Sequence, residues 1–113
     1  MQKIIRKLNI KDFEKTIGEN EYHEYFTDME REFYGKKRKK GSLAARYLLK
    51  NIIIENIGKN LKYTDIEILN NDLGKPVLVI NKLNKENLKT IHFSISHSKD
   101  VAIVLFVTDT DDL

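Results

Sequence analysis

Cysteine and tryptophan are absent from the 113-residue sequence, and it contains one proline and three histidines. The lack of cysteine excludes disulfide bonds, thiolate nucleophiles and thiolate metal ligands. Three histidines are few for a metal site built on imidazole ligands. Chemistry therefore has to come from Asp, Glu, Lys, Arg, Ser or His97, and we assign no metal ligand.

Long apolar runs are absent as well. Stretches such as residues 52–54 and 101–107 are far shorter than the roughly 20 residues of a membrane-spanning helix. No long apolar signal region follows Met1, so we expect a cytoplasmic protein. The length is that of one domain, and residues 1–113 are predicted to form a single domain that oligomerisation would help to stabilise.

Charge is balanced overall but concentrated at one place. The formal net charge is +3, yet one unbroken basic run comprises Lys36, Lys37, Arg38, Lys39 and Lys40. Such a run suits docking of an acidic protein, because complementary charges speed encounter. A solvated loop is the alternative. Nucleic acid is a poorer partner, since no aromatic residues interrupt the run and the whole-chain charge is low.

The first half of the chain has helical patterns. Residues 11–34 show amphipathic three- and four-residue spacings, which predict one or two helices broken near Gly18. Thr27 followed by Glu30 is a capping-box pattern for a helix that starts at Thr27. The apolar-rich run 43–57 predicts a long helix with Ser42 as N-cap and Gly58 as a left-handed C-terminal cap.

The second half has strand patterns. Residues 65–69 and 76–80 flank a turn and predict a hairpin, and residues 90–96 alternate with Ser94 and Ser96 on the polar face. The run 101–107 is apolar throughout, as a strand covered on both faces would be. We predict an α+β fold in which a long central helix packs on one mostly antiparallel sheet.

Four segments of the chain resemble, in order, the signature blocks of holo-acyl-carrier-protein synthases, the small trimeric type of 4'-phosphopantetheinyl transferase. The blocks are Phe26-Thr27-Asp28-Met29-Glu30, Leu43-Ala44-Ala45-Arg46-Tyr47-Leu48-Leu49-Lys50, Gly74-Lys75-Pro76 and Phe93-Ser94-Ile95-Ser96-His97-Ser98. The resemblance implies transfer of 4'-phosphopantetheine from coenzyme A to a serine of an acyl carrier protein. It also implies a homotrimer with coenzyme A sites between subunits, and a magnesium ion held by two carboxylates.

The resemblance assigns roles to particular residues. Gly74, Lys75 and Pro76 would bind the nucleotide end of coenzyme A, although on sequence alone they also fit an ordinary hairpin turn. His97, with Ser94 or Ser96, would contact the coenzyme A phosphates; the alternative is a solvated sheet face. His92 lies on the same face but matches no block, and we regard it as structural.

Two cations share a face of the predicted helix, since Arg46 and Lys50 are four residues apart. Both are expected to reach a pyrophosphate, and a solvated cationic stripe is the alternative. We assign the catalytic residues as Lys50, His97 and Asn51.

The chain differs from the family at the positions of the metal ligands. Asn51 stands where the family has a glutamate ligand, Glu55 where it has a lysine, and an ungapped alignment puts Arg6 in place of an aspartate ligand. Strong magnesium binding is therefore not expected. Two functions follow: a phosphopantetheinyl transferase, or a degenerate paralogue that binds coenzyme A or an acidic carrier protein without transfer.

Overall fold

The protein is described by a computed structural model that covers residues 2–36, 39–58, 60–81, 83 and 90–109. Its regular elements, in chain order, are β1 (Gln2–Asn9), α1 (Ile10–Thr16), a 3-10 turn (Glu19–Glu21), α2 (Tyr22–Tyr25), α3 (Asp28–Tyr34), α4 (Lys40–Asn56), a second 3-10 turn (Tyr63–Asp65), β2 (Ile66–Asn70), β3 (Pro76–Ile80), β4 (Ile91–His97) and β5 (Val101–Thr108). The predicted mixture of helices and antiparallel strands is confirmed.

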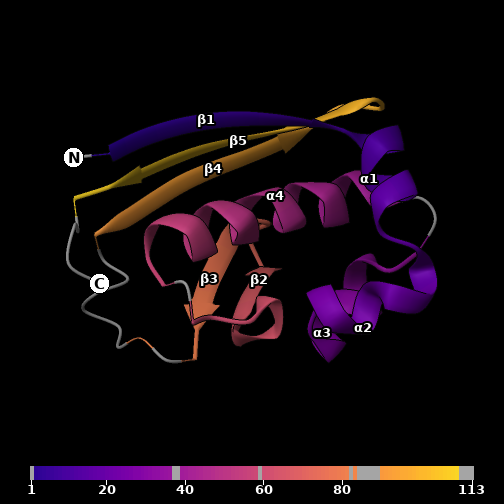
Figure 1. Ribbon diagram of the computed structural model, residues 1–113, viewed down its shortest axis with the longest axis horizontal. Helices are drawn as coiled ribbons and strands as arrows, with labels where there is room; N and C mark the ends of the chain where they lie inside the picture. Colours follow the sequence, from indigo (N-terminus) through magenta and orange to yellow (C-terminus); the bar gives the residue numbers. More distant parts are fainter. Residues whose placement is uncertain (1, 37–38, 59, 82, 84–89, 110–113) are drawn as a thin grey trace.

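Helix α4 is the centre of the molecule (Figure 1). A three-stranded antiparallel sheet of order β1-β5-β4 lies on one side of it, and the antiparallel pair β2–β3 lies on the other. Short helices α1, α2 and α3 gather at its N-terminal end. Residues along α4 are accordingly buried on several faces, including Leu43, Leu49, Ile52 and Ile53. None of the described helices is long and apolar enough to cross a membrane.

The prediction of one sheet from residue 65 onward is wrong, because α4 separates β2–β3 from β4–β5. The free side of β5 pairs instead with β1, in a register that sets Arg6 opposite Val104. Strand β5 is also not covered on both faces. Val104 and Phe106 are buried against α4, whereas Ile103 on the outer face is 37% exposed.

The long helix is confirmed, but both predicted caps are wrong. It begins at Lys40, so that Ser42 lies inside its first turn, and no side chain caps it at Lys39. At the other end Gly58 does not adopt a left-handed conformation; its N–H instead donates to the Ile53 carbonyl at 3.3 Å. This hydrogen bond to the carbonyl five residues earlier satisfies one of the last carbonyls of the helix, so no left-handed residue is needed.

Residues 10–34 form three short helices, more than the one or two expected. The break near Gly18 is confirmed, and the capping box is confirmed at α3: the Glu30 N–H donates to Thr27 Oγ1 at 3.2 Å, and the Thr27 N–H donates to Glu30 Oε1 at 3.0 Å.

Candidate functional site

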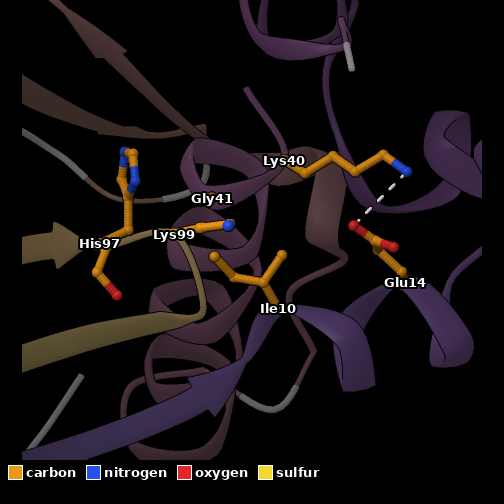
Figure 2. Close-up of a pocket in the computed structure, with 7 residues that line it drawn as sticks. Ile10, Glu14, Lys40, Gly41, His97 and Lys99 are labelled. Atoms are coloured by element: carbon orange, nitrogen blue, oxygen red, sulfur yellow. Dashed lines mark ion pairs between the residues drawn. The ribbon is translucent and has the colours of Figure 1, made fainter. Parts of the chain in front are cut away.

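A hollow of about 510 Å³ opens where the N-terminus of α4 meets the turn between β4 and β5. Figure 2 shows His97 and Lys99 on one side of Gly41, and Lys40 reaching the other way to Glu14 of α1. The Lys40 Nζ lies 3.6 Å from Glu14 Oε1. Ile10, Gly41 and Ser98 complete the lining. Segments from the two ends of the chain and from its middle therefore meet at this hollow.

His97 lies directly against the first turn of α4, and a glycine makes that approach possible. A Cβ atom added at Gly41 would stand 2.6 Å from His97 Nδ1, closer than atoms can approach. The other ring nitrogen, Nε2, lies 3.3 Å from Ser42 Oγ. The imidazole thus sits beside backbone N–H groups that no side chain caps and that carry the partial positive charge of the helix.

A second hollow of about 450 Å³ lies beside β4 and is lined by Lys75, Pro76 and residues 91–95. Its loop is held in one shape, because Asn71 Oδ1 accepts hydrogen bonds from the Leu73 and Lys75 backbone N–H groups. Gly74 has φ +80°, a conformation that strains other residues. The turn therefore presents Lys75 beside the polar face of β4.

Strand β4 connects the two hollows, and this brings together most of the predicted ligand-binding residues. Ser94 lines the second hollow, His97 lines the first, and Ser96 is exposed between them on the same strand. The sheet order β1-β5-β4 leaves β4 at an edge of the described sheet. An elongated anionic ligand could lie along this edge, with cations at each end of it.

Arg46 and Lys50 are not part of this surface. Arg46 is 2% exposed: its Nε donates to the Ile68 carbonyl at 2.7 Å, and its guanidinium stacks 3.7 Å above the Tyr34 ring. Lys50 is fully buried, and its Nζ lies 2.5 Å from Glu30 Oε1. The expectation that both reach a pyrophosphate is corrected, because their charges are directed into the core.

Burial dominates the electrostatics of Lys50. It lowers the pKa of the ammonium below its ordinary value, and the neighbouring carboxylate of Glu30 opposes that shift. The same carboxylate accepts the Ile68 N–H at 2.9 Å, so the pair also fixes β2 against α4. These contacts give Lys50 a structural role in the described part of the chain.

The residues at the family's metal position do not form a metal site. Arg6 Nη2 lies 2.6 Å from Glu55 Oε2, and Asn51 Oδ1 accepts a hydrogen bond from the Tyr63 hydroxyl at 2.5 Å. Among the described residues no group of three or more His, Cys, Asp or Glu side chains could hold a metal ion. A guanidinium and a neutral amide whose oxygen is already bonded do not fit magnesium, which requires several oxygen ligands.

The basic run is only partly described, because Lys37 and Arg38 lie outside the described residues. Lys36 and Lys39 are exposed. Lys40 begins α4 and pairs with Glu14 and, at 4.0 Å, with Glu19. The last residue of the run therefore belongs to the hollow beside His97.

Sequence reasoning missed four residues that surround the predicted ones: Gly41, Ser42, Lys99 and His92. Gly41 and Ser42 lie 55 and more residues from their contact, His97. The pattern of the sequence carries no signal for such a contact. His92 could have been found, because the alternation of β4 places it on the same face as Ser94 and Ser96. It lines the second hollow.

Comparisons with known proteins agree on one relationship. A family model described as "4'-phosphopantetheinyl transferase, N-terminal" matches residues 21–108. Holo-[acyl-carrier-protein] synthase of Clostridium tetani is 33% identical over 93 residues, which cover 74% of either chain. That of Petrotoga mobilis is 29% identical over 118 residues, which cover 96% of this chain and 91% of the other. The crystal structure of a holo-(acyl-carrier-protein) synthase from Bacillus anthracis in complex with CoA (3',5'-ADP) superposes with a TM-score of 0.75 at 27% identity, covering 94% of this chain and 93% of that one.

Proposed function

Because this chain belongs to the 4'-phosphopantetheinyl transferase family and is of the holo-acyl-carrier-protein synthase type, we propose that it transfers 4'-phosphopantetheine from coenzyme A to a serine of an acyl carrier protein. The observation that carries the proposal is that Lys75 and Pro76 of one motif line the same hollow as Ser94 of another, beside the edge strand β4. Coenzyme A is elongated and carries phosphates at its nucleotide end and at its centre, which suits such an edge.

In this reaction the serine oxygen forms a bond to the phosphorus nearer the pantetheine group. The bond between that phosphorus and the bridging oxygen breaks, 3',5'-ADP leaves with the electron pair, and the serine proton passes to a base. The transition state spreads negative charge over the phosphate oxygens, so positioning and cations supply most of the catalysis.

The site residues have distinct roles in this proposal. Lys75, presented by the fixed turn at Gly74 and Pro76, binds the nucleotide end of coenzyme A. His97 and the hydroxyls of Ser94 and Ser96 contact the phosphates, with the N-terminus of α4 beside them. An anion there gains from the uncapped N–H groups and the helix dipole.

Carrier docking is assigned to the basic run. Lys36 and Lys39 are exposed, and Lys37 and Arg38, outside the described residues, belong to the same proposal. Acyl carrier proteins are strongly acidic, so this run supplies the complementary charge. Arg46 and Lys50 contribute by holding α4 in place.

A homotrimer completes the proposal. The outer face of the three-stranded sheet exposes Ile5 to 61% and Ile103 to 37%, and Ser94 and Ser96 pair with Leu105 and Ile103 across the strands. The serine row of β4 therefore lies beside a row of exposed apolar side chains that a second copy would cover. Coenzyme A sites between subunits are consistent with that arrangement.

The coenzyme A site is tested by titration calorimetry of the unmodified protein and two variants. Lys75→Gln and His97→Ala should each raise the Kd by roughly 10- to 150-fold, because each removes a charge-assisted contact worth about 1.5–3 kcal/mol. Lys62→Gln is the control, an exposed lysine that lines neither hollow. Absence of binding at millimolar coenzyme A, or variants that bind as the unmodified protein does, would contradict the assignment.

A further inference from the structure

The ion pair between Arg6 and Glu55 has no place in the site described so far. Arg6 projects from β1 on the face that it shares with Ile4 and Leu8, both packed against the core, so it faces α4. Glu55 projects from the last turn of α4 and meets it at 2.6 Å. Their side chains are 37% and 52% exposed, which leaves both accessible to a ligand.

Asn51 lies one helical turn before Glu55 and so faces the same side of α4. Its oxygen accepts the Tyr63 hydroxyl at 2.5 Å, and burial, with smaller effects from Tyr47 and Tyr25, raises the pKa of Tyr63 to about 12. Tyr63 therefore keeps its proton at neutral pH and remains the donor. The two positions that resemble metal-ligand positions thus offer one cation and one amide, where a metal site would offer two negative charges.

We propose that, in a coenzyme A site between two copies of the chain, Arg6 of one copy binds the pyrophosphate directly, in place of a metal ion, while β4 of the other copy holds the nucleotide end. Glu55 holds the guanidinium in position until the phosphate displaces it. This inference rests on the proposed function, because it takes coenzyme A as the ligand. In the transfer step Arg6 neutralises charge on the pyrophosphate whose bridging bond breaks. Binding and transfer then require no magnesium.

The chemistry of the guanidinium supports this role. It carries five N–H donors in a planar fork that matches phosphate oxygens, and it keeps its charge at physiological pH. The contact with Glu55 runs through Nη2 and one carboxylate oxygen, so it does not occupy the whole fork. A pyrophosphate carries more negative charge than one carboxylate, and it can displace Glu55 from a pair that water already reaches.

The test is coenzyme A titration, once with EDTA and once with magnesium chloride. The unmodified protein should bind with the same Kd in both. Arg6→Gln should raise the Kd tenfold or more in EDTA, whereas Glu55→Gln should lower it severalfold, because the competing anion is gone. Arg31→Gln is the matched control: it makes the same substitution in an ion-paired arginine whose side chain is 38% exposed, on α3.

The outcomes separate this inference from the proposed function. Binding that occurs only with magnesium, or a Glu55→Gln variant that binds as poorly as Arg6→Gln, overturns the role of Arg6 and leaves the proposed function intact. No binding by the unmodified protein overturns both. If Arg6→Gln does not fold, Glu55→Gln carries the test alone, because it keeps the guanidinium and must bind more tightly.

Discussion

The ion pair between Lys50 and Glu30 joins two of the sequence blocks inside the core. Glu30 closes the Phe26–Glu30 block and Lys50 closes the Leu43–Lys50 block, and both side chains are fully buried. Glu30 Oε1 also accepts the Thr27 N–H, Oε2 accepts the Ile68 N–H, and Lys50 Nζ donates to the Tyr25 carbonyl at 2.9 Å. The last residues of these two blocks, Glu30 and Lys50, therefore stabilise the fold and do not contact the ligand.

Removal of one partner should accordingly be costly. Lys50→Met leaves the buried carboxylate of Glu30 without its cation, and we expect the free energy of unfolding to fall by about 3–5 kcal/mol. The double variant Glu30→Leu with Lys50→Met should lose less than the sum of the two single changes, because neither charge is left alone. Urea denaturation of the three variants measures this. A Lys50→Met protein as stable as the parent would show that the pair is not a structural contact.

At the scale of elements, the sequence predicts correctly the helices and turns that neighbouring residues determine. The apolar run of α4 is long, the Thr27–Glu30 capping box lies within one turn, and the β2–β3 hairpin closes over a short loop. The caps of α4 were wrong for a non-local reason. Ser42 is a good N-cap in isolation, but its hydroxyl lies beside His97, and the helix starts two residues earlier.

Strand pairing could not be read from the pattern. Strand β1 pairs with β5, almost the whole chain away, and its half-exposed, charged sequence has little alternation of its own. The separation of the strands into two sheets depends on α4, which is apolar on enough faces to pack against both. Nothing local distinguishes such a helix from one that covers a single sheet.

The candidate site was predictable only as far as the resemblance reached. The resemblance assigns residues 74–76 and 94–97 to one ligand, and four of them, Lys75, Pro76, Ser94 and His97, line one or the other of the two hollows beside β4. Arg46 and Lys50 could not be placed from the sequence. Two cations on one helix face give the same pattern whether they are solvated, bound to a ligand or buried. Tertiary packing determines their environment, and it places both side chains in the core.

At the scale of the whole molecule, the apolar side chains of Ile5, Ile103 and Leu105 on the outer face of the three-stranded sheet, which Lys3 and Lys7 flank, predict an assembly. Light scattering coupled to size exclusion should give the mass of three copies. Ile103→Glu should dissociate it, because the substitution puts a charge on the covered surface. Leu73→Glu is the control: Leu73 is 93% exposed in the β2–β3 turn, away from that face. A monomeric parent, or an Ile103→Glu trimer, would refute the assembly.

Intact-protein mass spectrometry of a carrier protein shows whether the protein transfers phosphopantetheine. The protein is incubated with coenzyme A and an apo acyl carrier protein, in EDTA and in magnesium. We expect the carrier to gain the mass of one phosphopantetheine group under both conditions, and a carrier with its serine changed to alanine to gain none. A carrier of unchanged mass, with coenzyme A shown to be bound, would mean that the protein binds its ligand without transfer and would contradict the proposed function.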